Sequence, residues 1–101
     1  MKECCREYLM NQFGDEDVSN EIYGEYASSV TEKISEAKSA LAAGEWQLLD
    51  RVAHTIKGNA LAAGDVEMSK PAIELRKASA LKDADGSAAL ISKIEELSKL
   101  L

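Results

Sequence analysis

The 101-residue sequence predicts an all-α protein: an antiparallel, up-down four-helix bundle preceded by a short extra N-terminal helix. The composition, with one proline, six glycines and 5% aromatic residues, argues against a β-sandwich or barrel, which needs frequent turns and many β-forming residues. Apolar residues instead recur at steps of three and four, which is the helical period. Glycines divide these stretches at short connections, which make consecutive helices antiparallel neighbours. Residues 1–101 are therefore expected to form a single domain.

The first two expected helices are separated by a glycine and an acidic segment. The first runs from Lys2 to Phe13 and stops at Gly14. Asp17 or Ser19 can cap the second, which ends at Gly44, a residue type common just beyond a helix C-terminus. The apolar positions of the second helix are Ile22, Tyr26, Val30, Ile34, Ala37 and Leu41.

The third expected helix covers Glu45 to about Ala63 and ends at Gly64. The fourth lies within residues 65–82 and contains the only proline, Pro71. Either Ser69 caps a late start of this helix, or the helix begins near residue 65 and bends at the proline. The sequence leaves both possibilities open.

A turn over Asp83–Gly86 precedes the last expected helix, which Ser87 would cap. The apolar face of this helix would consist of Leu90, Ile94, Leu97 and Leu101. The sequence thus predicts four substantial helices and one short leading helix.

The charge of the chain narrows the choice of partners. Its formal net charge is −6, so nucleic acid and anionic lipid surfaces would repel it. Its longest apolar stretches, such as Ala60–Ala63, are far shorter than the roughly 18 residues that span a bilayer. The segment Met1–Glu7 lacks the apolar core of a signal peptide, so we expect a cytoplasmic protein.

The cysteine and histidine content indicates no metal or cofactor of the chain's own. Cys4 and Cys5 are adjacent, and neighbouring cysteines rarely bridge because the ring strains the peptide between them. With His54 as the only histidine, a metal site would have to consist of carboxylates alone. We expect both thiols to be reduced and without a special role.

The third helix carries the residues that point to a function. At about 100° per residue, one arc collects its apolar side chains. This predicted buried stripe contains Trp46, Leu49, Val52, Ala53, Ile56, Ala60 and Ala63. His54 lies roughly 140° from the centre of the arc and should face solvent. The same side of the helix holds Gln47, Asp50, Lys57, Gly58 and Leu61.

Three features of this face suggest an accessible nucleophile. Gly58 costs a helix about 1 kcal/mol relative to alanine, but it leaves space one turn after His54. Lys57, three residues after His54, can reach a group attached to the imidazole. Leu61 supplies exposed apolar surface for a partner. A neutral imidazole has a lone pair that can accept a phosphoryl group, whose negative charge the lysine would partly neutralise.

Local charge agrees with this interpretation. Residues 46–82 hold six basic side chains (Arg51, Lys57, Lys70, Arg76, Lys77, Lys82) and four acidic ones (Asp50, Asp65, Glu67, Glu74). This region is therefore the least repulsive place for an acidic, phosphorylated partner. Simpler explanations also exist: His54 could pair with Asp50 four residues earlier, and Gly58 could serve close helix packing.

The segment Ala53-His54-Thr55-Ile56-Lys57-Gly58-Asn59-Ala60, followed by Gly64, resembles the signature of histidine-containing phosphotransfer (HPt) domains. The leading helix, the acidic link, Tyr26 where the family commonly has Phe, and Ala-Leu-Ala-Ala-Gly-Glu before the histidine helix follow the family's order. The resemblance implies a carrier without kinase activity. His54 would take a phosphoryl group from the aspartyl phosphate of a response-regulator receiver domain and pass it to another receiver.

The resemblance also assigns roles to neighbouring residues. Lys57 would steady the phosphoryl oxygens and Gly58 would allow close approach, while Gln47, Asp50, Arg51 and Leu61 would contact the receiver, which would bring the Mg²⁺. The family often has an acid or amide on the next helix that accepts a hydrogen bond from the imidazole. An ungapped count puts Arg76 there, and a cation cannot accept that bond. Arg76 would instead contact phosphate or imidazole, or a neighbour would replace it.

We therefore expect a monomeric phosphorelay intermediate whose partners are receiver domains and possibly a hybrid histidine kinase. One alternative is the phosphoacceptor domain of a chemotaxis-type histidine kinase, phosphorylated by an ATP-binding domain in trans. Another is a helical adaptor that docks receivers without being phosphorylated. A metal-dependent enzyme is disfavoured because the chain has a single histidine.

Overall fold

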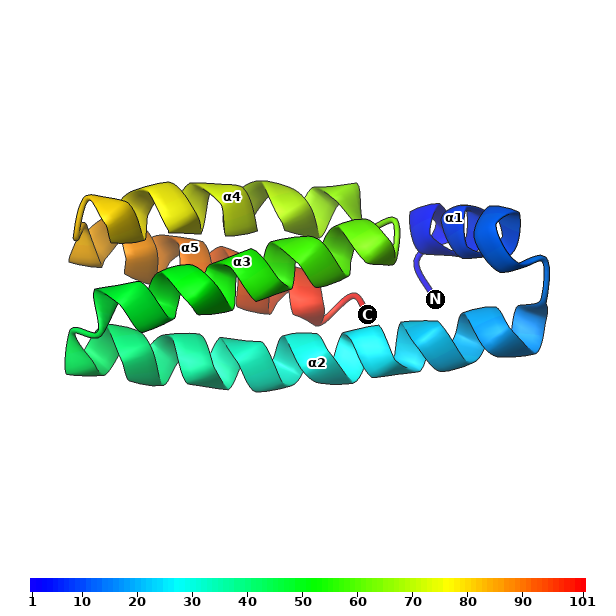
Figure 1. The fold of residues 1–101 in the computed structure, drawn as a ribbon, viewed down its shortest axis with the longest axis horizontal. Coiled ribbons are helices and arrows are strands. Elements are labelled where there is room, and N and C mark those ends of the chain that lie inside the picture. Colours follow the sequence, from blue (N-terminus) through cyan, green and yellow to red (C-terminus); the bar gives the residue numbers. More distant parts are fainter.

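A computed structural model describes residues 1–101, and every regular element in it is a helix. The helices are α1 (Glu3–Phe13), α2 (Glu16–Ala43), α3 (Trp46–Ala62), α4 (Val66–Ala80) and α5 (Ala84–Ser98) (Figure 1). The prediction of an all-α protein with a short leading helix is therefore confirmed. None of the five helices combines the length and the apolar character that crossing a bilayer requires.

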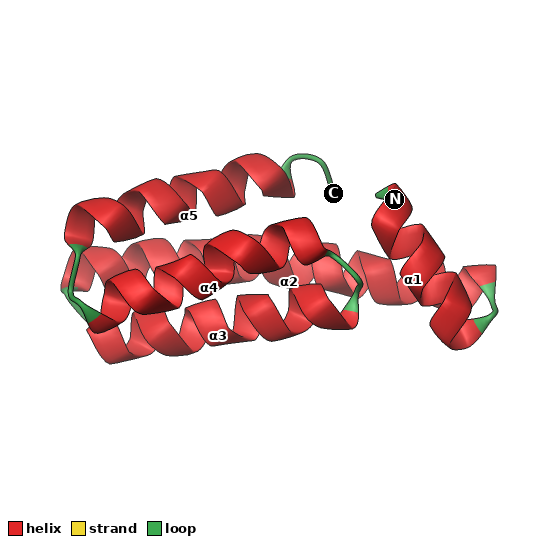
Figure 2. Cartoon of the chain, turned by 90° about the horizontal axis from the view of Figure 1, so that it is seen from above, coloured by secondary structure: helices red, strands yellow, loops and turns green.

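The molecule is elongated and measures 42 × 20 × 18 Å. Helices α2 to α5 lie side by side, and each short connection reverses the chain (Figures 1 and 2). Because α2 has 28 residues, its N-terminal part projects beyond the ends of α3, α4 and α5, and α1 packs against this projection. The packing of α3 against α4 is the most extensive contact in the molecule.

Aspartate side chains cap the N-termini of α2, α4 and α5. Some of these caps differ from the predicted ones. Asp15 caps α2 by accepting a hydrogen bond from the Val18 amide at 3.0 Å, so Asp17 and Ser19 lie inside the helix. Asp83 caps α5 through the Gly86 amide at 2.9 Å. The predictions of caps at Asp17 or Ser19 and at Ser87 were wrong, because an aspartate a few residues earlier satisfies the first amides in each case.

Helix α4 starts early and contains its proline. Asp65 precedes its first residue and accepts from the Met68 amide at 3.2 Å, which rules out a late start capped by Ser69. Instead, the Ser69 hydroxyl donates to the Val66 carbonyl. Pro71 is buried inside the helix, where its ring removes one intrahelical hydrogen bond.

The core follows the predicted apolar stripes of α2 and α3. Twenty buried residues form one cluster that includes residues of all five helices. On α2, Ile22 and Leu41 are only partly buried and pack against the edge of this cluster. On α5 the predicted stripe is partly wrong, because Ile91 is buried while Leu90 lies at the edge of the core.

A buried carboxylate ties α1 and α2 to the connection between α3 and α4. Asp65 is fully buried and accepts hydrogen bonds from the Tyr26 hydroxyl at 2.7 Å and from the Lys2 ammonium at 2.8 Å, besides the cap bond to α4. Nearby, Tyr8 packs so closely over Gly64 that a Cβ there would collide with its side chain. A buried charge is tolerated when it is paired and hydrogen-bonded, as here.

We predict that Tyr26→Phe destabilises the fold by about 1–3 kcal/mol, because one oxygen of the buried Asp65 carboxylate loses its donor. Tyr23→Phe is the matched control. Tyr23 is equally buried, but its hydroxyl only accepts a 3.3 Å bond from the Lys2 amide. Urea denaturation measures the free energy of unfolding of both variants. An equal loss of stability in the two would show that the hydrogen bond to Asp65 does not stabilise the fold.

The same network predicts a loss of stability in alkali. Burial, aided by Cys4, raises the pKa of Cys5 from 9.0 to about 12, and burial together with the Asp65 hydrogen bond raises the pKa of Tyr26 above its ordinary 10.0. Above pH 9 the unfolded chain therefore releases protons that the folded chain retains, so the free energy of unfolding falls. Thermal denaturation between pH 8 and 11 should show a falling Tm, with a smaller fall in Cys5→Ala. A flat profile would contradict these pKa directions.

Candidate functional site

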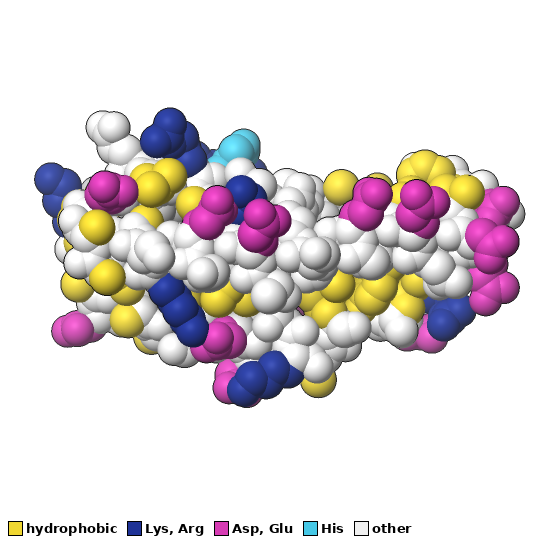
Figure 3. All heavy atoms as spheres, turned by 90° about the horizontal axis from the view of Figure 1, so that it is seen from below, with side chains coloured by type: hydrophobic (Ala, Val, Ile, Leu, Met, Phe, Trp, Pro, Cys, Tyr) yellow, Lys and Arg dark blue, Asp and Glu magenta, His cyan; other side chains and the backbone are white.

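Helix α3 divides its surface as the helical period predicts. Leu49, Val52, Ala53, Ile56 and Ala60 are buried against the neighbouring helices, together with Ala63 just beyond the helix end, while Trp46 is half-buried. On the opposite side His54 is exposed. The space-filling view shows the histidine at the surface next to basic side chains (Figure 3).

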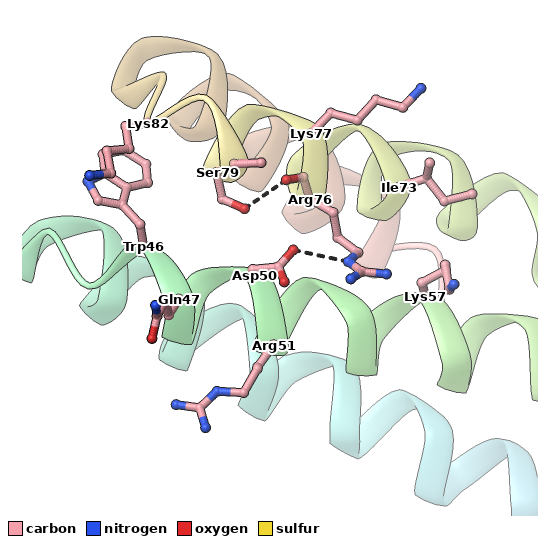
Figure 4. Close-up of a pocket in the computed structure, with 11 residues that line it drawn as sticks. Trp46, Gln47, Asp50, Arg51, Lys57, Ile73, Arg76, Lys77, Ser79 and Lys82 are labelled. Atoms are coloured by element: carbon pink, nitrogen blue, oxygen red, sulfur yellow. Dashed lines mark hydrogen bonds and ion pairs between the residues drawn. The ribbon is translucent and has the colours of Figure 1, made fainter.

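Arg76 on α4 contacts two residues of α3, His54 and Asp50. The Arg76 Nη1 atom lies 3.1 Å from Nδ1 of His54, and Nε of the same guanidinium donates to the Asp50 Oδ1 atom at 3.0 Å. The suggestion that His54 simply pairs with Asp50 is therefore wrong: the carboxylate binds the arginine (Figure 4). Arg76, which the ungapped count puts where an acid or amide is common, contacts the imidazole itself.

Lys57 and Gly58 lie one turn beyond His54. Lys57 is half-buried and forms no ion pair or hydrogen bond, so its ammonium is free to meet an anion. A Cβ added to Gly58 would meet nothing within 4 Å. Close packing between helices therefore does not explain this glycine, and the space above it is open to a partner.

An open groove of about 830 Å³ runs between α3 and α4 next to this histidine. Five of its eleven lining residues are basic, and Asp50 is its single acidic residue. The lining consists of Trp46, Gln47, Asp50, Arg51, Lys57, Ile73, Arg76, Lys77, Ser79, Ala80 and Lys82 (Figure 4). The groove thus collects most of the basic residues that the sequence places between residues 46 and 82 in an otherwise acidic chain.

The remaining predicted site residues are Gln47, Arg51 and Leu61. Gln47 and Arg51 are exposed, and the Arg51 side chain points away from α4 (Figure 4). Leu61 is 46% exposed although it is apolar. The structure therefore leaves Leu61 on the exposed surface outside the groove, whereas the other predicted site residues apart from His54 and Gly58 line it: Gln47, Asp50, Arg51, Lys57 and Arg76.

Some groove residues were not recognised from the sequence. Ile73 on α4 is such a residue, and the apolar pattern places Trp46 only in the core, whereas Lys77 and Lys82 are predicted only as part of the basic region. The excess of basic residues over residues 46–82 is the signal that points to them, because it covers both walls of the groove.

A cluster of metal-ligand types occurs elsewhere, and it includes two thiols, although the sequence indicated that any metal site would have to consist of carboxylates alone. Ligand atoms of Cys4, Cys5 and Asp65 lie within 4.8 Å of one another. However, the Asp65 oxygens already accept hydrogen bonds from Lys2, Met68 and Tyr26. The Lys2 ammonium thus supplies the positive charge that this carboxylate needs.

Comparison with known families places this geometry in context. The family model of the Hpt domain matches residues 21–100, and the chain belongs to this family. No curated protein and no solved structure matches the chain significantly. Hpt domains are phosphotransfer carriers of two-component signalling rather than kinases, and they interact with receiver domains and histidine kinases.

We predict that Gly58→Ala stabilises the protein by about 0.5–1 kcal/mol, because alanine favours the helix and its methyl group would meet no neighbour. Gly24→Ala on α2 is the matched control, since that glycine is also exposed, helical and without neighbours within 4 Å. Urea denaturation should give similar gains for both variants. A loss of stability confined to the Gly58 variant would indicate a packing role that the structure does not contain.

Proposed function

We propose that the chain is a phosphorelay intermediate in which His54 accepts a phosphoryl group from the aspartyl phosphate of one receiver domain and transfers it to another. The observation that carries this proposal is the exposed imidazole with a free ammonium and an open helix surface within one turn. A nucleophile that reacts with a group on another protein must be reachable, and His54 meets this condition.

Electrostatics support transfer at this histidine. The phosphoryl group brings negative charge to the imidazole, and the Lys57 ammonium has no other partner. The groove between α3 and α4 adds further cations beside the site. Phosphoryl transfer depends mainly on positioning and charge stabilisation, and these are what the α3 surface offers.

The docking surface in this proposal consists of Gln47, Asp50, Arg51 and Leu61 around the histidine. Leu61 would supply apolar contact, and Gly58 would let the receiver approach the imidazole closely. The scaffold is the up-down four-helix bundle formed by α2 to α5. In this proposal the protein acts as a cytoplasmic monomer without a cofactor of its own, and the receiver binds the Mg²⁺.

We predict that a ³²P-labelled receiver transfers an acid-labile label to the protein and that His54→Gln abolishes it. Lys57→Met should slow transfer roughly tenfold because the phosphoryl charge loses its counterion, whereas Lys57→Arg should retain most of the rate. Rapid-quench sampling followed by gel autoradiography measures these rates. Gly58→Ala should slow transfer more than Gly24→Ala, since only the former adds a methyl group beside His54.

A parallel reaction with ATP and a kinase core separates the alternatives. Label that arises only from the kinase core would indicate the phosphoacceptor domain of a chemotaxis-type kinase. No label from either donor would indicate an adaptor that docks receivers without being phosphorylated. Label that persists in the His54→Gln variant would assign the reaction to another residue.

A further inference from the structure

We propose that Arg76 is a positioning residue that controls where the His54 imidazole carries its proton. In the resting protein it would hold that proton on Nε2, and in the phosphorylated protein it would keep Nδ1 unprotonated. The first part depends on geometry alone, and the second rests on the function proposed above.

The proton assignment follows from the chemistry of the contact. Arg76 Nη1 lies 3.1 Å from Nδ1 of His54, at hydrogen-bond distance. A guanidinium has five N–H donors, no acceptor, and a positive charge at every pH that a protein tolerates. Nδ1 must therefore accept with its lone pair. A neutral imidazole has one N–H group, so its proton is on Nε2.

The guanidinium is held in this position from the histidine's own helix. Its Nε donates to Asp50 Oδ1 at 3.0 Å, and Asp50 precedes His54 by one turn of α3. The ion pair thus holds a cationic donor beside Nδ1.

The hydrogen bond from Arg76 to Nδ1 opposes transfer of a phosphoryl group to His54. Arg76 covers Nδ1, which leaves Nε2 as the nitrogen that faces a partner. During transfer the P–O bond of the aspartyl phosphate breaks, an N–P bond forms at Nε2, the carboxylate leaves, and the imidazole releases one proton to water. Because the resting proton is on Nε2, it must first move to Nδ1 through solvent, and the Arg76 hydrogen bond must break.

The same contact favours retention once the group is attached. In the neutral phosphohistidine Nδ1 again has a lone pair, which can accept the Arg76 hydrogen bond. Protonation of Nδ1 would make the ring a better leaving group, since cleavage of the N–P bond would then release neutral imidazole rather than its anion. The Arg76 hydrogen bond occupies the Nδ1 lone pair that would take this proton, so the residue lengthens the lifetime of the phosphorylated form.

The tautomer can be measured directly, because His54 is the only histidine and gives one set of ring ¹⁵N signals. Long-range ¹H–¹⁵N correlation at neutral pH should show the Nε2–H tautomer in the wild type and in Arg76→Lys, which keeps a cationic donor. Arg76→Glu offers an acceptor and should shift the population to Nδ1–H, with Arg76→Met between them. An Nδ1–H wild type, or equal populations in the wild type and the Glu variant, would overturn the proposal.

Lifetime is tested without any receiver by loading His54 chemically with phosphoramidate and following the ³¹P signal. We expect the wild-type phosphohistidine to decay about threefold to tenfold more slowly than that of Arg76→Met, with Arg76→Lys close to the wild type. Equal decay rates would overturn the retention role. If these results hold but receivers transfer no label, then the relay proposal fails while the proton assignment stands.

Discussion

The packing of the apolar stripe of α3 against its neighbours is the constraint on which the site depends. Ala53 and Ala60 lie fully buried within this stripe, and such small side chains let helices approach closely. Burial of the stripe fixes the rotation of α3 about its axis, so His54 must face outward. It also sets the register between α3 and α4, which places Arg76 opposite both Asp50 and His54.

The features that could be predicted from the sequence are those that depend on the spacing of apolar residues within one helix. The stripe on α3 repeats with the helical period over several turns, so its buried face and the exposure of His54 follow from spacing alone. Helix starts were harder to predict, because serines and aspartates near each boundary are all good caps. Asp15 and Asp83 lie only two to four residues before the predicted caps. On α5, adjacent apolar residues made Leu90 and Ile91 equally plausible core positions.

Contacts between distant residues could not be predicted from spacing. Asn59 donates to Ser29 at 2.9 Å across α2 and α3, and Asp65 binds Tyr26 and Lys2, which lie 39 and 63 residues before it in the sequence. The sequence did mark Arg76 as a departure from the family pattern. What the residue does there depends on the register of two packed helices, and a count along the chain does not give that register.

Charge is distributed unevenly over the molecule. The groove between α3 and α4 is basic, whereas the chain as a whole has a net charge of −6. A partner with an acidic face is therefore attracted by one side of the molecule and repelled by the rest, and the torque turns the two proteins toward a productive encounter before they touch. Since mobile ions screen such forces beyond about 8 Å at physiological ionic strength, the rate of encounter responds to salt while the bound geometry does not.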